Sequence, residues 1–387
     1  MAYLVLADGS VFQGRPVGAL GTTIGETVFT TGMTGYLETL TDPSYFGQIV
    51  TQTFPLIGNY GVIPQDFESK KSWVRGYIVR EICDLPSNFR CQGDLDSFLK
   101  SQNIVGICGL DTRALTKKLR EAGVMNGMIT SDEKCPKITE NLLNKIKNYK
   151  IENAVESVSC KKIEGQEKTG TGSCDFSGRQ NSSKKLLNVL LWDFGAKANI
   201  KRELEKRGVK VTVLPYSAKA EEILALKPDG LMLSNGPGDP ADNTGVISEI
   251  AKICDYDKKI LAQASGGEKS KPLVIFGICL GHQMLALSRG GKTSKLKYGH
   301  RGGNHPAKEC KTGRVFITSQ NHGYAVENDF LPQNAELSFV NCNDGTCEGL
   351  FYDDIPAFSV QFHPEACGGP HDTNFLFDKF VEMMKNR

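Results

Sequence analysis

Short apolar runs separated by turn residues fill the first part of the chain, a pattern typical of β-strands. One pair of runs, at 2–6 and 11–12, flanks Asp8-Gly9, a dipeptide that supplies the positive φ angles of a tight turn. We therefore expect a hairpin at the start of the chain. Further strands are expected where β-branched and aromatic residues gather, at 27–31, 48–53 and 76–81.

Helical periodicity follows these strands, at 94–100 and 112–122. The second segment has Asp111 or Thr112 as a candidate N-cap and Gly123 as a stop. The first half is thus expected to form a small, β-rich α/β domain.

From residue 186 onward, continuous apolar runs alternate with segments of helical period. A run without polar interruption, such as 186–192, is typical of a strand buried on both faces of a sheet. Strands are expected at 186–192, 209–214, 230–233, 273–277 and 357–362, and helices at 199–207, 220–226, 246–254 and 283–289. This alternation predicts βαβ units and a doubly wound, mainly parallel sheet. Ligands of such sheets bind beyond the carboxyl ends of the strands.

A polar stretch rich in Ser, Gly, Lys and Gln separates the two halves. The 387 residues are long enough for two to three domains. We expect an N-terminal domain at 1–154, a linker at 155–185 and a C-terminal domain at 186–387.

Composition narrows the classes of function. With 40% hydrophobic and 23% charged residues, and 46 basic against 44 acidic side chains, nothing points to nucleic acid or a membrane surface as a partner. The sequence contains no run of about 18 apolar residues that would predict a membrane span. Residues 1–10 lack the basic stretch and long apolar run of a secretory signal, so we expect a cytoplasmic protein with unpaired cysteines.

No metal or nucleotide site is expected from the sequence. It contains no Cys-x-x-Cys, and His300 and His305 are interpreted as loop or structural residues rather than ligands. The segment 289–293 resembles the end of a phosphate-binding loop, but Ala286 stands where that motif needs its first glycine.

Cys279 is the first candidate for chemistry. It stands in Gly277-Ile278-Cys279-Leu280-Gly281 between a predicted strand and a predicted helix, the setting of a nucleophile elbow. The glycines would allow a sharp turn, and the N-terminus of the following helix would favour the thiolate. The alternative is an inert cysteine buried in a strand-to-helix turn.

His363 and Glu365 are candidates for the proton transfer that a thiolate attacking an amide requires. Both lie just after the strand expected at 357–362, and residues two apart in an extended segment share a side, so Glu365 can orient the imidazole. Pro364 marks the end of the strand. The alternative is a surface His-Pro turn with a solvated glutamate.

The loop Ser234-Asn235-Gly236-Pro237-Gly238-Asp239-Pro240 follows the strand expected at 230–233. Its glycines let backbone N–H groups approach a ligand, and with the N–H of Leu280 they can form an oxyanion hole. Ordinary connections carry similar glycines, so the loop is weak evidence alone.

Three motifs together resemble a class I glutamine amidotransferase domain: the elbow with His282-Gln283, this loop, and His363-Pro364-Glu365. Segments of the first half are similar to the amino-terminal domain of carbamoyl-phosphate synthase small subunits. They are 31–36 (TGMTGY), 40–45 (LTDPSY), 55–61 (PLIGNYG) and 110–113 (LDTR), joined in the second half by 193–197 (DFGAK) and 320–323 (QNHG). The stretch 261–271 is longer than that resemblance leads us to expect.

The resemblance implies that Cys279 attacks the side-chain amide of L-glutamine to form a γ-glutamyl thioester, with His363 as acid and base and Glu365 holding the imidazole. It also implies a set of glutamine-binding residues: Ser44, Gly236, Gly238, Leu280, Gln283, Asn321, Gly323 and Tyr324. The family pattern has phenylalanine at position 324 and serine at 367, where this chain has Tyr324 and Cys367. The second departure weakens any role for a hydroxyl at that position.

The resemblance further implies a partner, because 387 residues leave no room for an ATP-driven synthetase. A large subunit would receive ammonia through an internal tunnel and make carbamoyl phosphate for arginine or pyrimidine synthesis from bicarbonate and ATP. ATP and magnesium are expected there, with no cofactor in this chain, and the assembly is expected to be a heterodimer or a higher oligomer. A stand-alone γ-glutamyl hydrolase and a non-enzymatic docking subunit are the alternatives.

Overall fold

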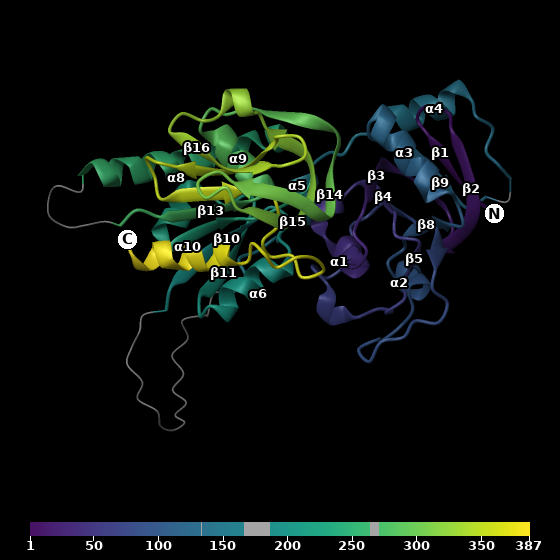
Figure 1. Ribbon diagram of the computed structural model, residues 1–387, viewed down its shortest axis with the longest axis horizontal. Coiled ribbons are helices and arrows are strands. Elements are labelled where there is room, and N and C mark those ends of the chain that lie inside the picture. The colour runs from purple at the N-terminus through teal and green to yellow at the C-terminus, as the bar shows by residue number, and fades with distance from the viewer. Residues whose placement is uncertain (133, 166–185, 264–270) are drawn as a thin grey trace.

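The computed structural model describes residues 1–132, 134–165, 186–263 and 271–387. The chain forms two lobes that lie side by side along the long axis of the molecule, the N-terminal one in purple and blue and the C-terminal one in green and yellow (Figure 1). Each lobe is built on its own sheet. This division confirms the expected α/β architecture with a smaller, β-rich first part.

The N-terminal lobe is a closed barrel with strand order β1-β2-β8-β6-β4-β3-β9. The predicted hairpin is present, since Leu4 pairs with Phe12 and Val5 with Val11, and Gly9 has a φ of 89°. The strands of this lobe are β1 (Ala2–Leu6), β2 (Val11–Gly18), β3 (Thr22–Thr30), β4 (Gln48–Gln52), β5 (Leu56–Ile57), β6 (Gly76–Ile78), β7 (Glu81–Ile82), β8 (Val105–Cys108) and β9 (Met125–Thr130).

One strand of this lobe differs from its prediction. The segment 76–81 was expected to be a single strand, but it divides into β6 in the barrel and β7, which pairs with β5 in a separate two-stranded sheet. The β-rich composition is the same on both sides of the break, so the pattern of residue types does not reveal it.

Five α-helices among the described residues accompany the barrel and the connection to the second lobe. The predicted helix 112–122 is found with those bounds, because the Asp111 side chain accepts a hydrogen bond from the Ala114 N–H and Gly123 ends the helix at a φ of 94°. The helices are α1 (Tyr36–Thr41), α2 (Leu95–Ser101), α3 (Thr112–Ala122), α4 (Glu140–Lys147) and α5 (Ala154–Val158).

The C-terminal lobe contains a nine-stranded sheet of order β11-β10-β12-β13-β18-β17-β16-β14-β15. From β11 to β18 the pairs are parallel, as predicted, whereas the strands beyond β18 are antiparallel and were not predicted. The strands are β10 (Asn188–Asp193), β11 (Lys210–Pro215), β12 (Gly230–Leu233), β13 (Val274–Ile278), β14 (Thr293–Glu309), β15 (Val315–Val326), β16 (Ala335–Asn341), β17 (Cys347–Tyr352) and β18 (Ala357–Val360).

Helices cover both faces of the parallel strands. Leu190 packs with residues of α7, α8 and α9, whereas its neighbour Leu191 packs with α6 and α10, because successive side chains of a strand point to opposite faces. The sheet is therefore doubly wound. The helices are α6 (Ala198–Lys206), α7 (Ala220–Ala225), α8 (Thr244–Gln263), α9 (Leu280–Ser288) and α10 (Phe375–Lys385). No helix in the described ranges is long and apolar enough to cross a membrane.

The beginning of the expected linker is ordered against the second lobe. Val155, in α5, joins the core on one face of the large sheet, and the backbone of Glu164 pairs with Val213 of β11. The remainder of the expected linker, 166–185, lies outside the described residues. So does 264–270, within the stretch that is longer than expected.

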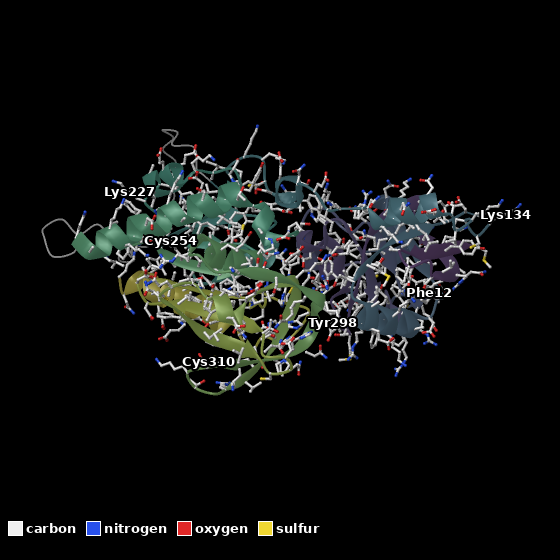
Figure 2. The ribbon with its side chains drawn as sticks, turned by 90° about the horizontal axis from the view of Figure 1, so that it is seen from above. Phe12, Lys134, Lys227, Cys254, Tyr298 and Cys310 are labelled. Atoms are coloured by element: carbon white, nitrogen blue, oxygen red, sulfur yellow. The ribbon has the colours of Figure 1, made fainter. Side chains whose placement is uncertain are left out.

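The two lobes meet along β14. Tyr298, labelled at the junction in Figure 2, packs against Phe29 of the barrel with ring centroids 6.1 Å apart. Nearby, Nζ of Lys295 lies 2.7 Å from Oε1 of Glu26, and the Val124 N–H donates to the Lys297 carbonyl. A strand of the second lobe thus also contributes to the packing of the first.

Candidate active site

Cys279 occupies a sharp turn at the carboxyl end of β13, directly before α9. Its φ of 52° and ψ of −102° lie in a region that residues with a side chain rarely adopt. A Cβ on Gly281 would stand 2.3 Å from the Leu233 carbonyl oxygen, and one on Gly277 would stand 2.9 Å from the Gly281 carbonyl oxygen. The predicted need for glycine on both sides of Cys279 is therefore confirmed.

His363 emerges beyond the neighbouring strand β18. The Cys279 N–H donates to the carbonyl of Val360, the last residue of β18, which ties the elbow to the segment that leads to His363. Within that segment Nδ1 of His363 lies 2.6 Å from Oε1 of Glu365, and both side chains are fully buried. Nε2 of His363 has no hydrogen-bond partner among the described residues, so it is free to exchange a proton with a bound substrate.

The charges around His363 favour its protonated form. Burial and the ammonium of Lys197 act to lower the pKa of His363, but the Glu365 carboxylate and Cys279 outweigh them and raise it to about 9. Burial acts to raise the pKa of Glu365, yet His363 and Lys197 lower it to about 2. The pair is consequently an imidazolium and a carboxylate at neutral pH.

A cavity of about 670 Å³ opens in front of Cys279. It is lined by seven of the eight residues that the resemblance assigned to glutamine: Ser44, Gly236, Gly238, Gln283, Asn321, Gly323 and Tyr324. Leu280 does not line it. The Leu280 N–H instead belongs to the first turn of α9, where backbone donors have no partner within the helix.

Hydrogen bonds from both lobes hold this lining in position. Nδ2 of Asn235, in the glycine-rich loop, donates to Oγ of Ser44 over 2.9 Å, and Nδ2 of Asn321 donates to Oδ2 of Asp42 over 3.1 Å. Gln283 donates to the Tyr324 carbonyl over 2.7 Å. The cavity is therefore a feature of the lobe interface, with Ser44 contributed by the barrel.

Lys197 was not singled out as a site residue from the sequence, although it lies in a segment that carries the family resemblance. Its Nζ lies 3.5 Å from both Oε1 of Glu365 and Oδ2 of Asp42 and is almost fully buried. Burial acts to lower the pKa of Lys197. The carboxylates of Asp42, Glu365 and Glu68 outweigh burial, so the pKa is raised above its usual value. One cation thus neutralises carboxylates from both lobes directly behind His363.

Arg301 was also missed. Its guanidinium is buried, lines the cavity and donates to the Tyr298 carbonyl over 2.7 Å. It forms no ion pair with a carboxylate in the part of the chain that the structure describes. Only the tertiary structure reveals it, because an arginine in a glycine-rich segment is usually exposed.

The two departures from the family pattern have different surroundings. Tyr324 lines the cavity, where burial and the charge of the Asp239 carboxylate raise the pKa of its phenol. Cys367 lies 3.6 Å from Oε1 of Glu68, and burial together with Glu68 and Glu38 raises the pKa of its thiol to about 12. Cys367 is consequently a neutral thiol at physiological pH.

A second cavity, of about 360 Å³, lies on the other side of Asn321, which lines both. Its walls come from both lobes and include Lys197, Ala366 and the segment 30–35. The surroundings of Asn321 are thus open on two sides.

Comparison with known proteins identifies the family. The family model described as "Carbamoyl-phosphate synthase small chain, CPSase domain" matches residues 4–129. The family model described as "Glutamine amidotransferase class-I" matches residues 190–383. A carbamoyl phosphate synthase small chain of Clostridium perfringens is 49% identical over 381 residues, which are 98% of this chain and 99% of the relative. The chain belongs to the carbamoyl phosphate synthase small chain family.

Of two further comparisons, the first is a close relative along nearly the whole chain and the second is a distant structural match. The carbamoyl phosphate synthase pyrimidine-specific small chain of Bacillus subtilis is 46% identical over 99% of this chain and 95% of its own length. A solved glutamine amidotransferase from Thermotoga maritima is 17% identical over 52% of this chain and 84% of its own, with a TM-score of 0.35, too low to carry an argument. The motif-based resemblance is confirmed, and the chain is an enzyme component with a class I glutamine amidotransferase domain in its second lobe.

Proposed function

We propose that this chain is the glutaminase subunit of a carbamoyl phosphate synthase and delivers ammonia from L-glutamine to a large synthetase subunit. The observation that carries the proposal is the arrangement of Cys279, at a strained elbow, beside a buried imidazolium–carboxylate pair at the same sheet edge. Cavity volume supports it as well, because about 670 Å³ accommodates a small amino acid.

In the first step the Cys279 thiolate attacks the side-chain amide carbon of glutamine, and the C=O electrons move onto oxygen. The N–H of Leu280, at the positive end of α9, and that of Gly236 stabilise this oxyanion. His363 then gives its Nε2 proton to the nitrogen as the C–N bond breaks. Ammonia leaves, and a γ-glutamyl thioester remains on Cys279.

In the second step neutral His363 takes a proton from water as its oxygen attacks the thioester carbon. The C–S bond breaks, glutamate leaves, and the thiolate and the imidazolium are restored. Glu365 fixes the imidazole so that Nε2 faces the reaction, and Lys197 keeps Glu365 ionised. Ser44, Gly238, Gln283, Asn321, Gly323 and Tyr324 hold the substrate.

Ammonia leaves through the second cavity, because glutamine fills the first one during the reaction. The partner that receives it uses bicarbonate and ATP with magnesium, and the two subunits form a heterodimer or a higher assembly in the cytoplasm.

The test is Cys279→Ser in the complex with the large subunit, with Cys342→Ser, an exposed thiol, as the matched control. We expect Cys279→Ser to abolish carbamoyl phosphate formation from glutamine while formation from ammonium chloride persists. Retention of the glutamine-dependent reaction contradicts the triad. Full glutamine turnover by the wild-type chain without a partner would favour the stand-alone hydrolase.

A further inference from the structure

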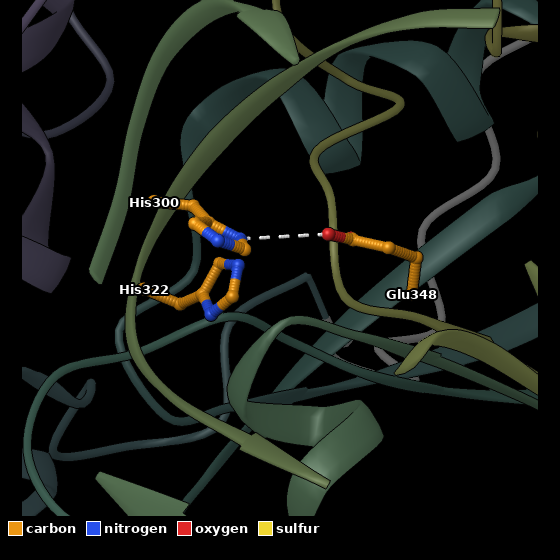
Figure 3. A group of neighbouring side chains, drawn as sticks. All are labelled: His300, His322 and Glu348. Carbon is orange, nitrogen blue, oxygen red and sulfur yellow. Dashed lines mark ion pairs between the residues drawn. The ribbon is translucent and has the colours of Figure 1, made fainter. Parts of the chain in front are cut away.

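Three buried side chains converge beside the cavity, in the antiparallel half of the large sheet: His300, His322 and Glu348 (Figure 3). Each offers one nitrogen or oxygen atom, and these atoms all lie within 4.8 Å of one another. His300 and His322 are register partners on β14 and β15, so their rings project from the same face, while Glu348 reaches them from β17. All three are at most 7% exposed.

Each of the three groups is oriented by an outer partner. Nε2 of His300 lies 2.8 Å from Oδ2 of Asp344, and Nδ1 of His322 lies 2.7 Å from the Tyr324 carbonyl oxygen. Oε1 of Glu348 accepts a hydrogen bond of 2.8 Å from the Asn341 side chain. Metal-binding histidines are typically held in this manner, with one ring nitrogen bonded to a carboxylate or carbonyl and the other facing the ion.

Two polar atoms of the cluster lack a hydrogen bond, although Nδ1 of His300 lies 3.6 Å from Oε1 of Glu348. Nδ1 of His300 and Oε2 of Glu348 are buried without a hydrogen bond to any described residue. Because the Tyr324 carbonyl can only accept, Nδ1 of His322 carries the proton and Nε2 keeps a lone pair, which faces the side-chain oxygen of Gln320 at 2.6 Å. Lone pairs thus outnumber donors at the centre of the cluster, which favours a cation there.

We propose that His300, His322 and Glu348 form a binding site for a zinc ion, which adjoins the cavity through His322 and takes no part in the proposed reaction. Two imidazoles and one carboxylate are a donor set that Zn²⁺ prefers, with a fourth position for water or the Gln320 oxygen. Bonds of about 2.0–2.1 Å in tetrahedral geometry separate the donors by roughly 3.3 Å. Nδ1 of His300 and Oε1 of Glu348 are already 3.6 Å apart.

Such an ion would tie β14, β15 and β17 together beside the cavity, since His322 lies between Asn321 and Gly323. Its role would be to hold this wall rather than to take part in the reaction. The competing account is a cluster held by protons alone, with His300 protonated between Asp344 and Glu348 and the Gln320 amide turned to donate to His322. The two accounts differ in whether the purified chain binds zinc here.

The experiment is a zinc titration of the full chain, after treatment with a chelator, against a chromophoric competitor. Cys279→Ser serves as the background, so that the elbow thiol cannot bind the metal. We expect one ion per chain, and an affinity at least about tenfold lower in Glu348→Gln, which keeps the side-chain volume. The matched control is His305→Asn, whose ring lies 5.2 Å from that of His300 but outside the set, and it should bind as the background does.

A second measurement covers the case in which Glu348→Gln does not fold or the other cysteines bind zinc. Crystals of the zinc-loaded background protein, measured at the zinc absorption edge, should give an anomalous peak between the three side chains. A peak elsewhere only, or equal affinity in Glu348→Gln and the background, overturns the proposal. Neither measurement uses glutamine hydrolysis, so the result does not depend on the proposed function.

Discussion

Glu365 accepts a hydrogen bond of 2.6 Å from Nδ1 of His363 at a position from which water is excluded. This contact decides both the orientation of the imidazole and its charge. The carboxylate belongs to a residue only two positions further along the chain. A substitution of Glu365 can therefore remove this contact without moving any strand.

The pH dependence of the glutaminase reaction should report on this contact. His363 has a pKa raised to about 9, so the imidazolium is present below that pH and is lost as the pH rises through it. Since the imidazolium must protonate the leaving ammonia, we expect kcat/KM for glutamine to fall above about pH 9. Steady-state rates measured across the alkaline range test this prediction. A kcat/KM that stays constant from neutral pH to beyond pH 10 would contradict it.

Glu365→Gln should move that alkaline limb to lower pH, because the negative charge of this carboxylate has the largest effect among those that raise the pKa of His363. The misoriented imidazole should also lower kcat by about 10²–10⁴-fold. Glu205→Gln, on the exposed face of α6, is the control and should leave both quantities unchanged. An unshifted limb in Glu365→Gln would show that this carboxylate does not set the charge of His363.

Lys197→Met should lower the free energy of unfolding by about 3–5 kcal/mol, because it leaves the buried Asp42 carboxylate without its cation and leaves Glu365 with His363 alone. Lys201→Met removes a surface pair with Glu205 and should change the free energy by less than about 1 kcal/mol. Urea unfolding of both variants measures the difference. Equal changes in the free energy of unfolding would mean that the buried ion pairs of Lys197 do not stabilise the lobe interface more than a surface pair does.

Gly281→Ala should destabilise the protein by about 1–3 kcal/mol or more and reduce glutaminase activity, since the new Cβ would stand 2.3 Å from the Leu233 carbonyl oxygen. Gly245→Ala is the matched control, because nothing lies within 4 Å of a Cβ there, near the start of α8. It should be neutral or slightly stabilising, as alanine favours a helix. Thermal unfolding and initial rates distinguish the two, and a tolerated Gly281→Ala would refute the tight packing of the elbow.

Tyr324→Phe restores the residue of the family pattern and tests whether the extra hydroxyl matters. The hydroxyl lies near the Asp239 carboxylate at the partly exposed wall of the cavity, so we expect a cost of about 0.5–1.4 kcal/mol, at most about tenfold in KM for glutamine. kcat should be unchanged. A large fall in kcat would instead assign the phenol a part in the reaction.

Local pattern determined much of this protein. The alternation of apolar runs and helical segments predicted the doubly wound sheet, and Gly277 and Gly281 marked the elbow around Cys279, because a strand, a tight turn and a helix each depend on residues near in sequence. The pairing of His363 with Glu365 follows from the same principle, since side chains two apart in an extended segment share a face.

Tertiary structure decided what depends on residues far apart in the chain. The barrel, the antiparallel half of the large sheet and the buried position of Lys197 between the two lobes all require long-range pairing, which no local period encodes. His300 illustrates the point, because alone in a glycine-rich segment it indicated only a structural residue. Strand register then brings it to His322 and Glu348, where three ordinary side chains share one buried centre.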